Sequence, residues 1–246
     1  MAVTGDLDRL AIDLATLFVL SATGRIIRVN SPGGGPGPRA ILAGCRAGNL
    51  VRMRQDVEDG AAREIDALVR EQTPWWDVDA PPACLPGIVA LLAREASVAA
   101  LSPAVIYGLP NNLRYEADAR LLSGDEAEGQ SLLDRLARGM PKTLLAAGFL
   151  DVDHLWPPWC AAIVGEEIAA LAFAARLGPL GAEVGVYTLA GFRGRGLAAA
   201  VTARWSSLAG LAGRQLFYST LATNLSSRRV AARLALTPLG ASVGFM

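Results

Sequence analysis

The chain has 246 residues, which is enough for one large domain or two small ones with a packed core. Its 23 basic and 23 acidic residues give a formal net charge of zero, so the overall charge does not point to a nucleic-acid partner. The single histidine, His154, argues against a histidine-based metal site and a hydrolase triad, and we expect no metal. The three scattered cysteines suit a reducing compartment.

Hydropathy does not indicate a membrane protein. The longest uncharged run, residues 96–113, is interrupted by Pro103 and Pro110, so we do not expect it to span a bilayer. The N-terminus carries Asp6 and Asp8, where a signal peptide has positive charge. The sequence therefore predicts a cytoplasmic protein without membrane contact.

The first part of the chain, residues 1–111, has an α+β pattern and no recognisable motif. Its apolar periodicity and its turn residues predict a short series of elements. They are a hairpin over residues 14–29, a mobile Gly/Pro-rich connector over 31–38, a hairpin over 39–54, a helix from Ala61 to Val69, a helix over 85–94 and a strand over 105–107.

The second part shows a different alternation of helices and strands. A capping box at Ser123 to Glu126 predicts the start of one helix, and Pro141 separates it from a shorter one. The expected strands of this part lie near 113–117, at 160–164, 168–173, 183–188 and 216–220, and within 236–246.

The stretch from Glu183 to Ala198 carries the strongest chemical signal. Residues 184–188 are largely β-branched and aromatic, which predicts a strand. A glycine-rich loop with two arginines follows, and apolar residues at helical spacing predict a helix that begins near Leu197. Backbone N–H groups at such a helix start are unpaired and lie in a positive dipole field, so the loop is a predicted phosphate site.

The charged residues after Glu183 are all positive. Residues 184–246 contain seven arginines and no acidic residue. The loop lacks the Gly-Lys-Ser/Thr of nucleoside-triphosphate loops, and no acid follows about twenty residues later to bind a dinucleotide ribose. We therefore expect a small polyanion as the ligand.

Four sequence pieces in this order resemble the GNAT N-acetyltransferase superfamily. They are Val-Tyr-Thr at 186–188, Arg-Gly-Arg-Gly-Leu-Ala at 193–198, Tyr-Ser-Thr at 218–220 and Asn-Leu-Ser-Ser at 224–227. The resemblance covers roughly the last hundred residues. It implies binding of acetyl-coenzyme A as a co-substrate, with its pyrophosphate at the loop.

The resemblance also implies roles for single residues. Backbone amides of the loop would hold the pyrophosphate, and the loop consists of Arg193, Gly194, Arg195, Gly196, Leu197 and Ala198. Thr188 and Leu189, at the end of the preceding strand, would bind the acetyl and pantetheine groups through their backbone. Asn224 can cap the last helix, contact pantetheine, or do both, and Ser226 is expected beside it on the cofactor side.

Two catalytic steps need residues of their own. Deprotonation of an acceptor ammonium needs a base, and Glu183 is the candidate. The alternative is that Glu183 is an ordinary glutamate at the solvent edge of a strand. The tyrosine that many family members carry seven residues after the asparagine is Ala231 here. Ser227, Ser226 or a water would therefore have to protonate the leaving thiolate.

We thus expect an α+β protein with an N-terminal α+β domain, residues 1–111, and a GNAT domain, residues 112–246, whose mixed, mostly antiparallel sheet is flanked by helices. The expected reaction is direct transfer of an acetyl group to a primary amine of a small molecule or peptide. One strand follows the last helix where the family often has two. The far edge of the sheet is therefore expected to be short, or completed by another chain in a homodimer. The alternatives are a non-catalytic acetyl-coenzyme A sensor and an interaction protein that binds an acidic partner.

Overall fold

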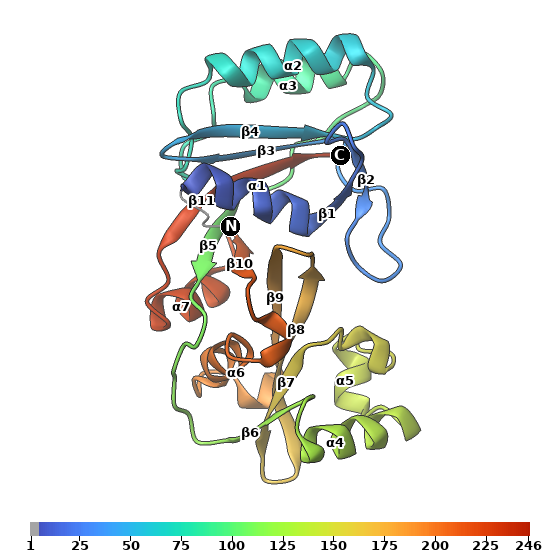
Figure 1. Cartoon of the computed structure of the whole chain (residues 1–246), viewed down its shortest axis with the longest axis vertical. Helices are drawn as coiled ribbons and strands as arrows, with labels where there is room; N and C mark the ends of the chain where they lie inside the picture. The colour runs from blue at the N-terminus through green and yellow to red at the C-terminus, as the bar shows by residue number, and fades with distance from the viewer. Residues whose placement is uncertain (1–4) are drawn as a thin grey trace.

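The computed structural model describes residues 5–246 and contains one large sheet and one small hairpin (Figure 1). The strands are β1 (Phe18–Leu20), β2 (Ile26–Val29), β3 (Ala40–Cys45), β4 (Gly48–Met53), β5 (Ala104–Leu109), β6 (Arg120–Ser123), β7 (Trp159–Val164), β8 (Glu167–Leu177), β9 (Gly181–Thr188), β10 (Gln215–Leu221) and β11 (Pro238–Phe245). The helices are α1 (Asp6–Leu17), α2 (Asp59–Glu71), α3 (Leu85–Leu92), α4 (Ala127–Arg138), α5 (Lys142–Ala146), α6 (Leu197–Trp205) and α7 (Leu225–Arg233).

The large sheet has nine strands in the order β4-β3-β11-β5-β10-β9-β8-β7-β6. Among the strands that the structure describes, only the β9–β10 pair is parallel, and every other neighbouring pair in this sheet is antiparallel. The expected α+β fold with a mixed, mostly antiparallel sheet is therefore confirmed. The expected succession in the second part is also present, although its first strand is β6 and not residues 113–117.

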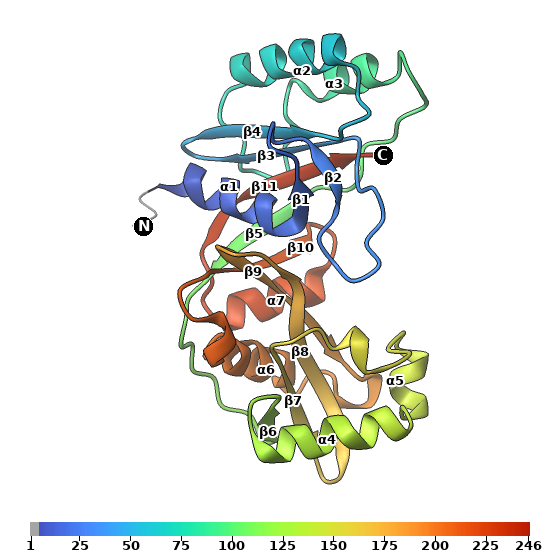
Figure 2. The ribbon, with the colours of Figure 1, turned by 45° about the vertical axis from the view of Figure 1, so that its right-hand side comes forward.

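Helices cover both faces of the sheet (Figures 1 and 2). Alternate residues of β5 show which helices share a face, because Val105 and Tyr107 pack in the cluster of α6 and α7, whereas Ile106 packs with Leu10 of α1. On β11, Ala241 lies opposite Val105 and packs in the cluster of α2 and α3. One face thus carries α2, α3, α6 and α7, and the other carries α1, α4 and α5.

The N-terminal residues form a helix where the sequence pattern predicts the start of a hairpin. Residues 14–17 are the last turn of α1, so the prediction of a hairpin from residue 14 is wrong at its beginning, and only β1 and β2 form the hairpin. Two acidic residues in the first turn, Asp6 and Asp8, favour a helix start. Leu10 and Leu14 lie on one face of this helix and are fully buried against the sheet.

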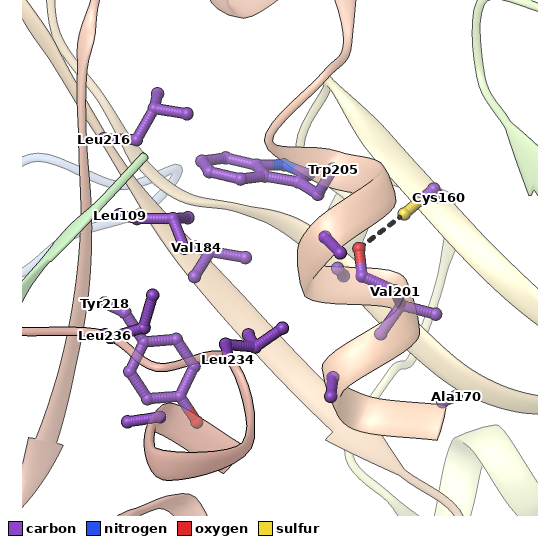
Figure 3. Packing of buried hydrophobic residues seen from close by; sticks show 14 of the residues in the cluster. Leu109, Cys160, Ala170, Val184, Val201, Trp205, Leu216, Tyr218, Leu234 and Leu236 are labelled. Atoms are coloured by element: carbon purple, nitrogen blue, oxygen red, sulfur yellow. Dashed lines mark hydrogen bonds between the residues drawn. The ribbon is translucent and has the colours of Figure 1, made fainter. Parts of the chain in front are cut away.

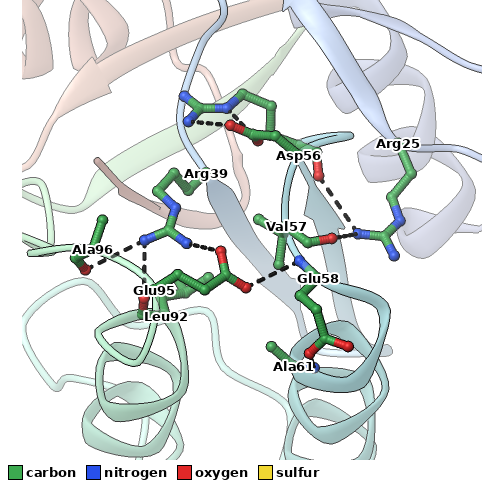
Figure 4. Close-up of polar contacts among 10 residues, drawn as sticks. Arg25, Arg39, Asp56, Val57, Glu58, Ala61, Leu92, Glu95 and Ala96 are labelled. Carbon is green, nitrogen blue, oxygen red and sulfur yellow. Dashed lines mark hydrogen bonds and ion pairs between the residues drawn. The ribbon is translucent and has the colours of Figure 1, made fainter.

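A buried arginine ties α2 and α3 to the sheet (Figure 4). Arg39, just before β3, is 7% exposed, forms an ion pair with Glu95 and donates from Nη1 to the Leu92 carbonyl at 2.9 Å. Glu95 in turn accepts from the backbone N–H of Glu58 at 3.0 Å, and Glu58 caps α2. The charged network therefore joins the sheet and both helices of this layer.

The sheet has no break at the predicted domain boundary near residue 112. Residues before this point supply β3, β4 and β5, and β5 lies between β10 and β11, antiparallel to both. A short edge and a strand from another chain are the two possibilities expected from the sequence here, and β5 of the same chain lies in this position. A homodimer stays a prediction. The division into residues 1–111 and 112–246 stays a prediction from the sequence, whereas the shared sheet leads us to expect that the two parts fold together.

The largest core cluster lies between the sheet and α6 (Figure 3). Trp205, at the end of α6, is fully buried and donates from Nε1 to the Pro158 carbonyl at 2.8 Å. Small residues let α6 approach the strands closely, and Cys160 of β7 donates from Sγ to the Val201 carbonyl at 3.2 Å. This packing fixes the start of α6 beside the end of β9.

β9 and β10 separate along their length. Their parallel pairing comprises three residue pairs and ends at Glu183 and Phe217. Beyond this point β9 continues to pair with β8, and β10 continues to pair with β5. The backbone edges of residues 184–188 and 218–221 therefore face each other across a gap in the sheet.

Candidate active site at the gap between β9 and β10

A cleft of about 600 Å³ opens between the end of β9 and the N-termini of α6 and α7, and we call it the anion cleft. Most of the residues predicted for the site lie in its wall. They are Thr188, Arg193, Gly194, Gly196, Leu197, Ala198, Asn224, Ser226 and Ser227. The structure thus brings together residues from one strand, one loop and two helices.

The loop before α6 depends on two glycines with left-handed backbone. Gly194 has φ of 82° and Gly196, the N-cap of α6, has φ of 80°, a region that side chains rarely adopt. A Cβ at Gly196 would also lie 3.1 Å from the Tyr115 hydroxyl. The first helical bond runs from the Ala200 N–H to the Gly196 carbonyl, so the three N–H groups before it are left for a ligand.

Three of the seven arginines after Glu183 line the anion cleft, namely Arg193, Arg229 and Arg233. The other four do not line it. Arg195 lies over the ring of Phe192, a residue of the cleft wall, and the remaining three make contacts elsewhere. Arg204 pairs with Glu126, Arg214 donates to the Gly178 and Gly210 carbonyls, and Arg228 donates to the Ala222 carbonyl. The cleft therefore combines three guanidinium groups with a free helix N-terminus, which favours a ligand with several negative charges.

Two of the predicted cofactor residues are placed differently. Leu189 donates its backbone N–H to the Ala169 carbonyl at 3.0 Å, and its side chain packs in the cluster of α4 and α5. Because β8 already uses this donor, the Leu189 N–H is not free for a ligand, and the predicted cofactor contact of Leu189 stays a prediction. Arg195 is absent from the cleft wall, since its guanidinium carbon lies 5.8 Å from the Phe192 ring centre.

Asn224 and Ser227 shape the far wall of the cleft. Asn224 caps α7 by accepting the Ser227 N–H at Oδ1, at 3.1 Å, and also lines the cleft, so capping and ligand contact are compatible. The Ser227 hydroxyl lies 2.6 Å from the Tyr218 hydroxyl. Burial raises the pKa of Tyr218, so the phenol keeps its proton at neutral pH.

Tyr218 is a candidate that the sequence pattern did not single out. It stands on β10, lines the gap and packs in the large buried cluster (Figure 3). The same cluster contains Ala231, the position where the family resemblance leads one to expect a tyrosine. Ala231 has no exposed surface. A small residue on α7 therefore leaves room for a phenol that comes from the strand.

Glu183 lines an adjoining pocket of about 350 Å³, which we call the side pocket. The two pockets share four residues of the gap: Val186, Tyr218, Asn224 and Ser227. Burial raises the pKa of Glu183 above its ordinary range. The Ser219 hydroxyl and the Arg176 guanidinium oppose this rise, because both favour the charged carboxylate. Within the described residues, the Ser219 hydroxyl forms no hydrogen bond of normal geometry.

Two unpaired buried hydroxyl groups border this gap. Among the described residues, the buried side-chain atoms without a hydrogen-bond partner belong to Asp13, Arg52, Arg176, Thr188 and Ser219. Thr188 lines the anion cleft and Ser219 lines the side pocket. Buried polar atoms are normally paired, so these two hydroxyl groups are available to polar atoms of a ligand.

Other chemistry is not supported by the described residues. Burial raises the pKa of the Cys160 thiol to about 12, so this residue is a core contact and not a nucleophile. In residues 5–246 no cluster of three metal-binding side chains is found. None of the helices in this part of the chain is both long and apolar enough to cross a membrane.

Comparison with known proteins gives a likeness in fold only. No protein-family model and no curated protein matches the chain. Solved structures of acetyltransferases do match, with low identity. A GNAT-family acetyltransferase from Colwellia psychrerythraea is 15% identical to this chain. The match covers 63% of this chain and 60% of the Colwellia protein, with a TM-score of 0.41.

Two further structures are GCN5-related N-acetyltransferases. The one from Kribbella flavida is 20% identical, covering 64% of this chain and 62% of its own, with a TM-score of 0.43. The one from Sphaerobacter thermophilus is 12% identical, covering 89% of this chain and 79% of its own, with a TM-score of 0.41. This chain thus spans less than two thirds of the length of the Colwellia and Kribbella proteins. The function has to come from the residues of the cleft.

Proposed function

We propose that the chain is an acetyl-coenzyme A-dependent N-acetyltransferase that acts on a primary amine. One observation carries this proposal. The anion cleft, with a free helix N-terminus and three arginines, opens onto the same gap that borders the carboxylate of Glu183. A phosphate site and a carboxylate on two connected pockets suit a reaction between a phosphate-bearing donor and a cationic acceptor.

The residues present fit coenzyme A. The absence of a side chain at Gly196 leaves the backbone N–H groups of α6 accessible to a pyrophosphate. The unpaired Thr188 hydroxyl lies at the end of β9, where the gap meets the anion cleft. The exposed backbone edges of β9 and β10 suit the amide groups of a pantetheine arm. The bound donor would supply a thioester carbonyl at the gap.

The chain's own groups then have three tasks. Glu183 accepts the proton of the acceptor ammonium, so that the free amine can attack the carbonyl. Backbone N–H groups of β9 on the gap side stabilise the negative charge on the carbonyl oxygen. The Tyr218–Ser227 hydroxyl pair donates the proton that the leaving thiolate takes up. The nitrogen of the adduct still carries one surplus proton, and this proton replaces the one that the hydroxyl pair has given to the thiolate. Amine and thioester thereby become amide and thiol, and Glu183 releases its proton to solvent.

The variant Glu183→Gln tests the assignment of the base. Its kcat on a competent amine is expected to fall at least about tenfold, since general-base assistance contributes about 10² to 10⁴ in rate. The affinity for coenzyme A is expected to stay unchanged, because Glu183 lies outside the anion cleft. Glu167→Gln, on the exposed end of β8, is the matched control. Wild-type turnover in Glu183→Gln would remove this residue from the mechanism.

The same assay separates an enzyme from a sensor. Release of free thiol is measured over a panel of primary amines with acetyl-coenzyme A. In wild type, turnover should rise with pH through the raised pKa of Glu183, because the carboxylate is the active form. Tight coenzyme A binding without thiol release for any amine would instead favour a non-catalytic sensor.

A further inference from the structure

Asp13 is buried where the packing of α1 gives no reason for a carboxyl group. It has no exposed surface, and both of its carboxyl oxygens are buried without a hydrogen-bond partner. Its helical neighbours on the same face, Leu10 and Leu14, pack on the sheet as ordinary core residues. A buried polar group without a partner costs stability, so its presence here calls for a functional explanation.

α1 lies unusually close to the strand that carries Glu183. A Cβ on Gly181 of β9 would collide with the Thr16 hydroxyl and would lie 2.9 Å from a methyl carbon of Ile12. Only glycine therefore allows the helix to approach at this level. Asp13 lies between Ile12 and Thr16 in the helix, and Glu183 follows Gly181 by two residues on the same strand face.

Several charged groups lie on the elements that pack against α1. Glu183 is on β9, Arg176 is on β8, Arg52 is on β4, and Arg9 is on α1 itself, where it pairs with Asp6 at 3.6 Å. β3 brings the buried thiol of Cys45, and β10 brings Tyr218, which faces the opposite side of the sheet. β11 has no titratable side chain. None of these groups forms a hydrogen bond with Asp13.

Asp13 holds a proton under conditions in which other aspartates are ionised. Burial raises its pKa well above the ordinary range, and the negative charge of Glu183 adds to the rise. Glu183, which borders the side pocket, loses its proton first, and the two carboxyl groups titrate as a pair. Between the two deprotonation steps the pair therefore consists of an uncharged Asp13 and an ionised Glu183.

On the basis of the proposed function, we propose that Asp13 is a positioning residue for Glu183. While Asp13 keeps its proton, α1 packs closely on β9 and holds Glu183 at the wall of the side pocket. Loss of this proton puts an unpaired charge between helix and strand, opens the contact and lowers the transferase rate. Asp13 thereby sets the alkaline limit of activity and connects the N-terminal helix to the reaction.

The sign of the effect on stability follows from the direction of the pKa shift. Because the folded protein binds the Asp13 proton more tightly than the unfolded chain does, this residue favours folding at low pH. That contribution is lost as pH rises from the ordinary aspartate pKa through the raised one. Asp13→Asn cannot ionise and keeps the size of the side chain, so its stability should depend less on pH.

The experiment measures thermal unfolding and the pH dependence of kcat for wild type, Asp13→Asn and the control Asp8→Asn, which changes an exposed aspartate of the same helix. From about pH 5 to about pH 9, the Tm of Asp13→Asn should fall less than that of wild type, and Asp8→Asn should follow wild type. The kcat of wild type should decline about tenfold per pH unit on the alkaline side, and Asp13→Asn should lack this decline at unchanged KM for acetyl-coenzyme A.

Three results would overturn the proposal. Equal pH dependence of Tm in wild type and Asp13→Asn would show that ionisation of Asp13 does not matter. A shallower Tm dependence with an unchanged alkaline decline of kcat would leave Asp13 a structural role alone. If Asp13→Asn does not fold, carboxyl-carbon NMR titration of wild type decides, because the pKa of Asp13 must lie above the ordinary aspartate range. An ordinary aspartate titration of Asp13 would overturn the proposal. A wild-type chain without turnover would refute the proposed function, while the Tm comparison would still test the pair.

Discussion

A shortened chain that begins at residue 112 is expected not to fold. It lacks β5, which pairs over six residues with β10 on one side and with β11 on the other. Its removal also takes Val105, Tyr107 and Leu109 out of the main core cluster. Loss of three large buried side chains costs about 2 to 5 kcal/mol each, which approaches or exceeds the stability of most domains.

A single substitution in the full chain tests the same role of β5. Ile106→Pro removes a backbone donor and inserts a ring in a strand that is paired on both sides. Far-ultraviolet circular dichroism and a thermal melt should show loss of the cooperative fold. The control Glu116→Pro lies in the exposed connection between β5 and β6 and should melt like wild type. A cooperative melt of residues 112–246 alone would instead support an independent C-terminal domain.

Gly196→Val is expected to abolish the stabilisation by coenzyme A. A β-branched residue at φ of 80° is strained by about 1 to 3 kcal/mol, and its side chain would meet Tyr115 and block the approach to the α6 N-terminus. At about a hundredfold excess over Kd, coenzyme A should stabilise wild type by about 2.7 kcal/mol, and this gain should vanish in the variant.

Gly213→Val is the matched control for this substitution. Gly213 has φ of 77°, but a Cβ added to it would meet no atom within 4 Å, and it lies outside the anion cleft. The variant should suffer similar backbone strain and keep the full response to coenzyme A. A normal response in Gly196→Val would show that the ligand does not approach the helix start.

The sequence predicted the parts of the site that are encoded locally. The strand, the glycine loop and the start of α6 follow one another within a few residues, so composition and spacing specify them. The Asn224 cap is local in the same way, because it joins residues three apart. Predictions of this kind need no knowledge of how distant segments meet.

Contacts between distant segments could not be predicted in this way. The insertion of β5 between β10 and β11 depends on strand pairing over more than a hundred residues of sequence. Asp13 is close to β9 only because α1 folds across the sheet. The Tyr218–Ser227 contact spans only nine residues, but it depends on how α7 packs against β10. The use of the Leu189 N–H by β8 likewise depends on strand pairing.

Binding of coenzyme A to the full-length protein tests the central claim most directly. The measurement is the shift in thermal unfolding with saturating coenzyme A, compared with inorganic pyrophosphate and an unrelated polyanion at equal ionic strength. The account predicts a stabilisation of about 2.7 kcal/mol at a hundredfold excess over Kd, much larger than with either control. An unchanged melting temperature, or an equal shift with the unrelated polyanion, would contradict it.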